Sequence, residues 1–591
     1  MNEKPKSVWT RPCSGGWSIA GWFIILFAAN LAILVCHNLM LAESRSFSDF
    51  ILPALGLSAG LALLFMGGAW FLRWSRSWRN LRRLLFGVVC FITLIALFYA
   101  EENWRGKWAW KNYQRAAEAR GEKLDLAALA PPPVPDDQNF AMTPLWVEEI
   151  SSILGMEKAK LWYDENRIAA LGHTNFVQPL NLPIELPGRD LESPNLPVGD
   201  WRLAKKTDLG SWQHYYRQLA EKTNFFPVAT APQTPAQDVL LALSRYDGTI
   251  EELRRASQLP YARFPITYTN EVKARIVLPH LSSLKGLTRM LCLRASAELQ
   301  ADQPDQALAD FKLMFRLSAA LQIEPFLISH LVNIAMFNLE LQSIWEGLAD
   351  RKWNDRQLLA LDTELARLDF LASYQLAIRG ERANIVDSID YLRRRPNRIE
   401  EYLELTDLDE TIMPRLVQIG PSGWFEQNKL ALCRFMTDTY LPIVNLKDRT
   451  YSATNGAKAE TDLVELTSRR TPYNWLSRKI MPALASASTK FVQAQAATDL
   501  ARVAIALERH RLALGEFPAT LAALEPQFIA KLPHDVMNGQ PLKYRRMADG
   551  SFILYSVGWN ETDDGGEVAL SEKGKVPLMT QGDWVWRYPT K

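Results

Sequence analysis

The sequence predicts a mainly α-helical membrane protein that ends in a small α+β module. Three patterns support this prediction: long uncharged runs in the first hundred residues, apolar residues recurring every three or four positions through the middle, and two short alternating segments around a turn near the C-terminus. The length of 591 residues is enough for several domains. We expect a three-helix membrane anchor, a helical extension with a proline-rich spacer, a helical body and a C-terminal module, at residues 1–100, 101–135, 136–471 and 472–591.

The anchor is predicted from three stretches, residues 12–42, 51–72 and 84–100, that contain no Asp, Glu, Lys or Arg. An α-helix needs about 20 residues, and at least roughly 17, to cross the hydrocarbon core of a bilayer. All three stretches meet that limit. A cleaved signal peptide would have a shorter apolar region and would not be followed by two further apolar runs. The sequence therefore predicts three transmembrane helices.

The basic residues predict how this anchor is oriented. Lys and Arg near the ends of membrane spans are retained in the cytoplasm, and they precede the first and third stretches, at Lys4, Lys6, Arg11, Arg73, Arg76, Arg79, Arg82 and Arg83. We expect a multi-pass protein of the bacterial inner membrane, with a cytoplasmic N-terminus and a periplasmic region after Ala100. Trp104, Trp108 and Trp110 then lie where an interfacial aromatic belt is expected on the outer face.

Composition limits the partners and the chemistry. The chain carries 67 basic and 65 acidic side chains, and the part after the anchor is close to neutral, so we expect no nucleic-acid partner. Cys292 and Cys433 lie in helical, apolar contexts outside the anchor. Buried free thiols are favoured over a disulfide between them, and no cysteine or histidine cluster has the spacing of a zinc site.

The region after the anchor is predicted to be mostly helical. A helix continuing from the third apolar stretch should end before the prolines at 131, 132, 133 and 135, which form a stiff spacer, and prolines make residues 175–200 irregular. Thr234 before Pro235 has the pattern of a helix N-cap. Further helices are expected at 324–347, 354–368, 373–394 and 424–440. The charged residues of this region could form a charged active surface, but a solvated helix face with local ion pairs is favoured; they are Arg379, Glu381, Arg382, Asp387 and Asp390.

A helical hairpin is predicted at about residues 281–321. Ala295, Ala307 and Phe311 have the spacing at which small residues let two helices pack and an aromatic ring fills the seam, so this pair resembles one tetratricopeptide hairpin. Arg294 and Glu298 depart from that pattern, and no second copy follows at a fixed period. A single hairpin within an irregular bundle is favoured over a repeat solenoid.

The C-terminal module has the clearest order of elements. A helical pattern from about Pro472 ends at Gly515, a turn surrounds Asn538 and Gly539, and strands flank the Asp549–Gly550 turn. This order, with Leu532, Pro533, Asp535, Tyr544 and the stretch 556–566, resembles the globular domain of the major pseudopilin of type II secretion systems. The resemblance covers about 80 residues. The chain could not be processed as a pilin, because its module begins far from the membrane segment, so a shared fold alone is implied.

That resemblance implies a calcium loop after the last strand of the hairpin. Ser556, Asn560, Asp563 and Asp564 are the candidate ligands, since calcium prefers carboxylate, amide and hydroxyl oxygens. Asn560 and Glu561 stand where the family has aspartate followed by glycine. An acidic, glycine-rich surface turn without metal remains the alternative.

No catalytic motif accompanies these elements. In the part of the sequence after the anchor there is no GxSxG, no HExxH and no glycine-rich phosphate loop. We expect no catalytic residues and interpret the protein as an interaction or scaffold protein of the cell envelope, bound to the lipid bilayer and to other envelope proteins. Secretion is the process that the pseudopilin resemblance suggests for it. The alternative is a membrane-tethered extracytoplasmic hydrolase.

Overall fold

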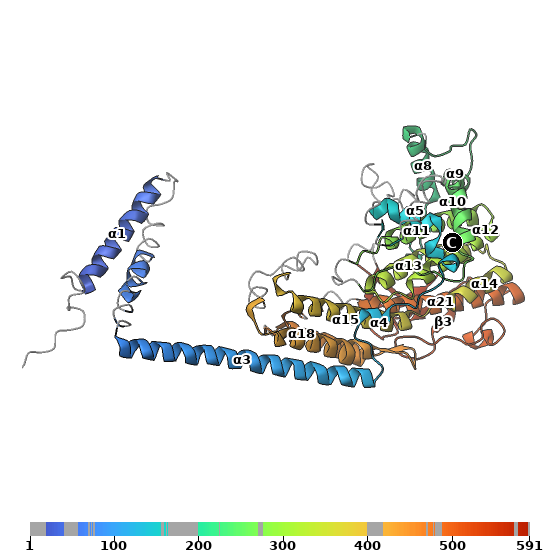
Figure 1. The fold of residues 1–591 in the computed structure, drawn as a ribbon. Helices are drawn as coiled ribbons and strands as arrows, with labels where there is room; N and C mark the ends of the chain where they lie inside the picture. The colour runs from blue at the N-terminus through green and yellow to red at the C-terminus, as the bar shows by residue number, and fades with distance from the viewer. Residues whose placement is uncertain are drawn as a thin grey trace, which may run out of the picture. The chain divides into compact units, whose positions relative to one another are not determined.

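The structure, a computed structural model, is mainly helical with a small C-terminal region of strands (Figure 1). It describes residues 19–40, 57–64, 66–68, 71, 74, 77–154, 159–160, 162–163, 199–223, 225–269, 276–398, 418–468, 471–476, 478, 481, 487–571 and 577–588. Residues up to Glu101 form one compact unit, and Glu102–Lys591 form another. Most of the predicted irregular segment 175–200 lies outside the described residues.

The membrane region differs from the prediction. Among the residues that the structure describes, α3 (Trp78–Ala119) is the one helix long and apolar enough to cross a membrane. The first predicted span carries α1 (Ile19–Met40), whose described apolar stretch is Phe23–Ala32, and the second carries a short apolar helix, Leu57–Gly68. α1 has 22 residues, about the length a span requires, but only these shorter apolar stretches of the two segments are described. The described residues therefore contain one candidate span where three were predicted.

The second unit is built from helices joined by short connections. Its first half contains α4 (Leu126–Leu129), η2 (Asp136–Gln138), η3 (Phe140–Met142), α5 (Pro144–Leu154), η4 (Trp201–Leu203), α8 (Leu209–Thr223), α9 (Pro235–Leu243), η5 (Ser244–Tyr246), α10 (Asp247–Ala256), α11 (His280–Gln300) and α12 (Pro304–Leu321). The second half contains α13 (Leu327–Ala349), α14 (Asp355–Leu365), α15 (Phe370–Arg394), η7 (Pro396–Arg398), α18 (Gly423–Arg434), η8 (Phe435–Tyr440), η9 (Leu441–Ile443), α19 (Ala453–Ser468) and α21 (Ala487–Leu514).

Local sequence signals explain several of these boundaries. Thr234 accepts a hydrogen bond from the backbone N–H of Gln237 at 3.3 Å, and the Gln237 side chain binds back to Thr234, so α9 begins with the predicted cap. The predicted hairpin is confirmed as α11 and α12. Gly515 has φ +85°, which ends α21 at the predicted residue.

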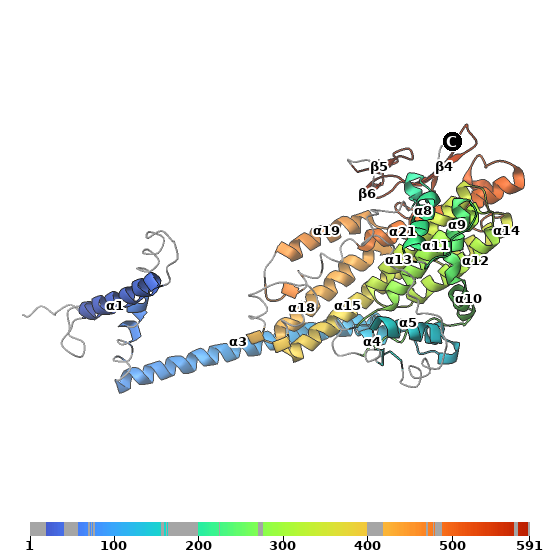
Figure 2. The ribbon, with the colours of Figure 1, turned by 90° about the horizontal axis from the view of Figure 1, so that it is seen from above.

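The core lies where α13, α15 and α21 pack against one another, and the two ribbon views show these helices side by side (Figures 1 and 2). α21 is buried along nearly its whole length and also contacts α14. The helix that begins the C-terminal module is thus also a central helix of the body. The predicted boundary between residues 471 and 472 falls inside the compact second unit.

The strands form three small antiparallel sheets. Strands β3 (Lys543–Arg546), β4 (Phe552–Ser556) and β7 (Trp584–Trp586) form one sheet in the order β3-β4-β7, which packs on α21 through β4 and β7. The register pairs Tyr544 with Leu554 and Leu554 with Trp586. The other two sheets are the pairs β1 (Val444–Asn445) with β2 (Thr450–Tyr451), and β5 (Val568–Leu570) with β6 (Pro577–Gly582). The predicted hairpin at Asp549–Gly550 is confirmed.

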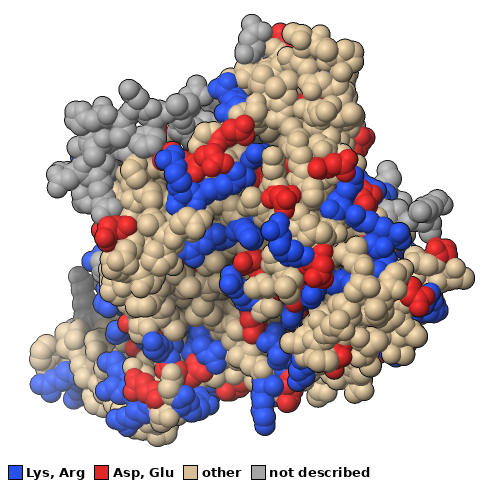
Figure 3. All heavy atoms as spheres, turned by 90° about the vertical axis from the view of Figure 1, so that its right-hand side faces the viewer, with Lys and Arg blue, Asp and Glu red and all other residues tan. Residues whose placement is uncertain are grey.

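Charged side chains of both signs lie on the face of the helical body seen at the right of Figure 1. Figure 3 shows basic side chains gathered across the middle of that face, with acidic side chains between them. Several basic residues are paired within the body, for example Arg254 with Glu251 and Asp310. Such pairs join neighbouring helices, so this face does not carry a patch of positive charge alone.

Candidate functional site

The candidate site is the junction at which the end of α3 enters the second unit. The N-terminal part of α3 carries the uncharged stretch, and residues from Glu102 onward pack against α18. A Cβ atom on Gly423 would lie 2.1 Å from the carbonyl oxygen of Glu102, and one on Gly106 would lie 2.4 Å from the carbonyl oxygen of Gly423. Only glycine fits at both positions, so the two helix backbones touch.

Hydrogen bonds to Asn103 hold α3 against the start of α18, next to this backbone contact. The Asn103 side-chain oxygen accepts hydrogen bonds from the Gly423 N–H at 2.8 Å and from the Ser422 hydroxyl at 2.9 Å. These bonds satisfy groups at the start of α18 that no helical partner can reach. The Asn103 side chain therefore acts as the cap that α18 does not supply from its own chain.

Glu102 forms a second set of contacts on the same turn. Its carboxylate is buried, and it accepts hydrogen bonds from the Tyr473 hydroxyl at 3.0 Å and the Trp424 indole N–H at 3.2 Å. Arg105 pairs with the same carboxylate and also donates to the Tyr473 hydroxyl. A buried carboxylate is costly unless it is paired and hydrogen-bonded, and here both conditions are met.

Two turns further on, Trp110 lies under a buried ammonium group. The Lys429 nitrogen is 4.3 Å from the Trp110 ring centroid, 2.8 Å from an Asp390 oxygen and 2.7 Å from a Glu426 oxygen. The Lys429 side chain is 2% exposed. The sequence placed Trp110 in an interfacial aromatic belt. That expectation is corrected, because Trp110 faces the body and contributes to a cation–π contact there.

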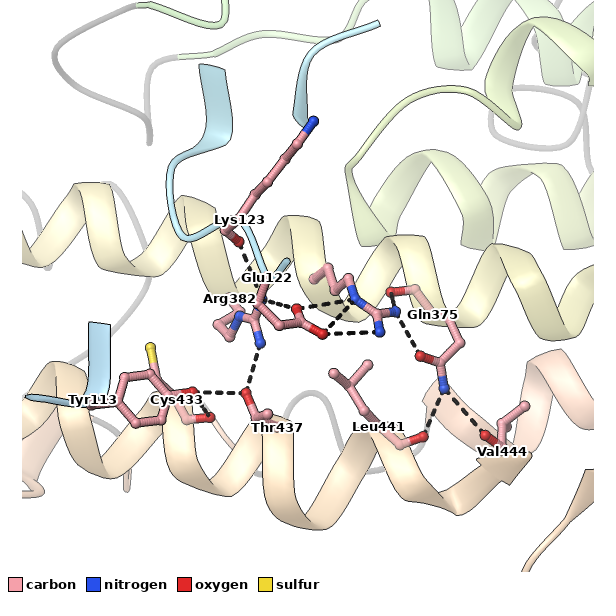
Figure 4. Close-up of polar contacts among 10 residues, drawn as sticks. Tyr113, Glu122, Lys123, Gln375, Arg382, Cys433, Thr437, Leu441 and Val444 are labelled. Atoms are coloured by element: carbon pink, nitrogen blue, oxygen red, sulfur yellow. Dashed lines mark hydrogen bonds and ion pairs between the residues drawn. The ribbon is translucent and has the colours of Figure 1, made fainter. Parts of the chain in front are cut away.

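The end of α3 reaches a polar network that joins it to α15 and to the π-helical turn η8 (Figure 4). The Tyr113 hydroxyl lies 2.9 Å from the Thr437 hydroxyl and donates to the carbonyl oxygen of Cys433 at 3.2 Å. Arg382 donates to the Thr437 hydroxyl at 2.6 Å. The wider π-helical turn is a feature that helices often carry at functional positions.

Glu122 completes this network from the segment after α3 (Figure 4). Its carboxylate accepts from Arg382 at 2.6 Å and from Arg379 at 3.1 and 3.2 Å. Burial alone would raise the pKa of Glu122, but the hydrogen bonds from Arg382 and Arg379 outweigh it and hold the pKa below its ordinary value. Arg382 is fully buried. The interpretation of Arg379 and Arg382 as a solvated face is therefore wrong, because their partner lies more than 250 residues away in the sequence.

The network continues to an open hollow beside the β1–β2 hairpin. Arg379 donates to the Gln375 side-chain oxygen at 2.6 Å, and the Gln375 amide donates to the carbonyl oxygens of Leu441 and Val444. The hollow has a volume of about 620 Å³ and is lined by Gln375, Pro442, Val444, Asn445, Leu446, Thr450, Tyr451, Ser452 and Asn455. None of these residues is charged, a cysteine or a histidine. The lining offers hydrogen bonds to a neutral group and no nucleophile with an adjacent base.

Both cysteines of the body are buried and free, as the sequence predicted. Burial raises the pKa of Cys433 to about 12 and raises that of Cys292 as well. A reactive cysteine needs a lowered pKa and access to solvent. These two thiols are therefore packing groups.

Of the predicted calcium ligands, Ser556 ends β4 and the other three lie in the loop after it, and the four do not share one centre. The Ser556 hydroxyl points inward and donates to Asp535 at 2.8 Å. Asn560 donates to Asp564 at 2.9 Å, whereas Asp563 pairs with the Lys543 ammonium at 3.0 Å. Within the described part of the chain, no three histidine, cysteine or carboxylate groups are placed to hold one ion. A lysine ammonium is thus the counter-charge that Asp563 has in this structure.

One carboxylate beside this loop was missed in the sequence. Asp583 is 2% exposed, and one of its oxygens accepts the Gly566 N–H at 2.7 Å. Its other oxygen is buried without a hydrogen-bond partner. Burial raises the pKa of Asp583, backbone hydrogen bonds oppose that effect, and the nearby charges of Asp564 and Asp563 raise it further. No motif marks this residue, because Asp583 follows β6 and lies 19 residues beyond Asp564 in the sequence.

The junction residues were also missed, although one signal was present. A glycine inside a long helical pattern costs about 1 kcal/mol relative to alanine and often marks close packing. Gly106 is such a glycine. Its partner Gly423 could not be assigned from the sequence, because more than 300 residues separate the two.

No protein-family model, curated protein or solved structure matches the chain.

Proposed function

We propose that the protein is an interaction or scaffold protein of the bacterial cell envelope, in which α3 crosses the inner membrane and the second unit stands in the periplasm. The observation that carries this proposal is the junction. The helix with the uncharged stretch continues into the second unit and is held there by Glu102, Gly106 and Tyr113. Such an attachment would join the second unit to a membrane helix without an intervening linker, as a scaffold requires.

The orientation follows from the residues that flank the uncharged stretch. Five basic residues, Arg73, Arg76, Arg79, Arg82 and Arg83, lie in the eleven residues before it, against three, Arg105, Lys107 and Lys111, in the eleven after it. This asymmetry favours a cytoplasmic start for α3 and a periplasmic second unit. The proposal needs only the single span and does not depend on the two segments before it.

Protease treatment of spheroplasts tests the topology. We expect added protease to digest the region beyond Pro135 in intact spheroplasts, with a cytoplasmic protein as the protected control. Protection of that region until lysis would overturn the proposal. Crosslinking in intact cells, followed by identification of the captured proteins, then tests the scaffold role, and recovery of no envelope protein would count against it.

We also propose that the C-terminal module has the fold of a pseudopilin globular domain. Support comes from the order of its elements, which is α21, the turn at Asp535, the β3–β4 hairpin and the acidic loop. α21 is buried against the body, so the surface left for partners is the sheet and its loops. An experimental structure of the full chain, compared with pseudopilins, would test this proposal.

A calcium ion in the acidic loop is proposed as part of that module. The donor chemistry suits calcium, because Asp563, Asp564 and the unpartnered oxygen of Asp583 are carboxylates of one small region. Binding would require Lys543 to leave Asp563. If calcium binds, it would supply charge that lets these carboxylates approach one another and would rigidify the loop.

The hydrolase alternative would need carboxylates or histidines that converge on a pocket. The hollow beside the β1–β2 hairpin has no such residue in its lining. It therefore gives this alternative no support.

A further inference from the structure

The part of α3 beyond Glu101 has two faces with different surroundings. Glu102, Gly106, Trp110, Tyr113 and Ala117 are buried and follow one another at spacings of three and four residues, which places them on the side against the body. The opposite side carries Trp104, Lys107, Trp108 and Lys111, again at spacings of three and four. All four are exposed. We call these four residues the outward strip.

The outward strip is unusual for a soluble surface. Trp104 is 66% exposed and Trp108 is 59% exposed, and their rings stack with centroids 6.3 Å apart. Lys107 and Lys111 flank the ring pair, and both are exposed and form no ion pair among the described residues. Tryptophan with neighbouring cations is the combination found at the interface between lipid and water.

We propose that the outward strip binds the headgroups of anionic phospholipids at the periplasmic surface of the membrane. The inference deepens the proposed function, since it rests on α3 crossing the bilayer. Two observations select lipid as the occupant. The strip follows directly after the uncharged stretch of the same helix, and its two lysines are complementary to lipid phosphate. The stacked indole rings supply the apolar part of the contact.

The geometry of a helix limits which residues can take part. Lys107 lies about 10 Å along the helix from Ala100, and Lys111 about 16 Å, at 1.5 Å per residue. Helical side chains lean toward the N-terminus, and lysine extends its ammonium toward the interface, so both can reach back toward the headgroups. Arg115 lies on the same side about 6 Å further out. It is exposed but too distant for the same contact.

The opposite end of the uncharged stretch has a similar composition. Trp78 is 65% exposed, and the Arg82 guanidinium lies 5.2 Å from its ring centroid. An exposed indole next to a cation thus stands on both sides of the uncharged stretch, as two interfaces would require. Glu101 and Glu118 border the outward strip and limit its positive charge to the segment between them.

The test uses the purified full chain in a neutral detergent, to which phosphatidylglycerol or phosphatidylcholine is added. Binding is followed by native mass spectrometry and by the thermal midpoint. We expect phosphatidylglycerol to bind and to raise the midpoint, with a smaller effect of phosphatidylcholine. In Lys107→Gln/Lys111→Gln, affinity for phosphatidylglycerol should fall about fivefold per lysine. The matched control Arg115→Gln/Arg120→Gln removes two charges further from the bilayer and should bind as the wild type does.

Equal binding by the Lys107→Gln/Lys111→Gln variant and the wild type would overturn the inference, and so would an equal loss in the Arg115→Gln/Arg120→Gln variant. A photo-crosslinker placed at Trp108 in cells must capture lipid, and capture of a protein instead would assign the strip to a protein partner. Carbonate extraction of membranes separates this result from the proposed function. Release of the wild type by carbonate would refute the span itself, whereas retention with unchanged lipid binding would refute only the outward strip.

Discussion

Gly423 lies directly on the backbone of Glu102, and no side chain fits between the two residues. This contact joins the helix that carries the uncharged stretch to α18, and Asn103 and Tyr473 surround it with hydrogen bonds. Since the distance between the two helices is set by backbone atoms, the junction has little freedom to slide. Four predictions follow from this and other buried contacts.

Replacing Gly423 with alanine should destabilise the second unit by about 1–3 kcal/mol, the cost typical of overpacking. The new Cβ would meet the Glu102 carbonyl oxygen at 2.1 Å, and backbone cannot rotate away as a side chain can. Gly248→Ala is the matched control, because it lies in α10 with nothing within 4 Å. Thermal unfolding of both variants checks the prediction, and an equal midpoint in the two would contradict it.

Glu122→Gln should destabilise the protein at neutral pH by about 3 kcal/mol, because buried Arg382 loses its counter-charge. The pKa of Glu122 is lowered in the folded state, so its contribution is present above the ordinary carboxylate pKa and is lost as the pH falls through the lowered value. The difference in the free energy of unfolding between the wild type and the variant should therefore become smaller in acid. Denaturant unfolding at pH 7 and pH 4 measures it, with exposed Glu118→Gln as control. A gap that does not depend on pH would argue against an ionic role.

Glu340→Gln should become stabilising at alkaline pH. Glu340 is fully buried, one oxygen accepts from the Ser318 hydroxyl at 2.8 Å, and the other has no partner. Burial raises the pKa of Glu340 to about 7. A raised carboxyl pKa means that stability falls as the pH rises from the ordinary value through the folded one.

The free energy of unfolding of the variant, relative to that of the wild type, should accordingly rise by up to about 3 kcal/mol between pH 4.5 and pH 8. Unfolding curves across that range provide the measurement. The same substitution at exposed Glu221 should show no such trend. If both variants respond alike, Glu340 does not carry the effect.

Calcium should raise the thermal midpoint of the full chain, and more so in Lys543→Met, which removes the ammonium that competes for Asp563. A ligand at 100 times its Kd stabilises the native state by about 2.7 kcal/mol. Asp583→Asn should abolish the response, because the unpartnered oxygen is lost as an anionic ligand. Differential scanning calorimetry with millimolar calcium and with chelator is the measurement. An unchanged midpoint in both the wild type and Lys543→Met would exclude a specific site.

Much of the local structure could be predicted from the sequence. The start of α9 at Thr234, the end of α21 at Gly515 and the hairpin turn at Asp549–Gly550 depend on backbone preferences of a few adjacent residues. The helical hairpin of α11 and α12 was predicted from the spacing of small and aromatic residues. Such signals are local, so they can be recognised without knowledge of the rest of the chain.

The membrane prediction succeeded in part, for the same reason. The uncharged stretch at 84–100 lies in a helix long enough to span, whereas the two earlier stretches do not meet that criterion in the described residues. Apolar composition is a local property, so the span at 84–100 could be recognised without the rest of the chain.

By itself the sequence determined where helices and turns form and which segment of α3 is apolar, because these depend on neighbours along the chain. Tertiary structure decided that Trp110 faces the body while Trp108 faces outward, and that Arg382 is buried against Glu122. Those outcomes depend on which surfaces of the chain are buried against each other when it folds. Residues that meet across more than 250 positions leave no pattern of spacing, so only the folded chain reveals them.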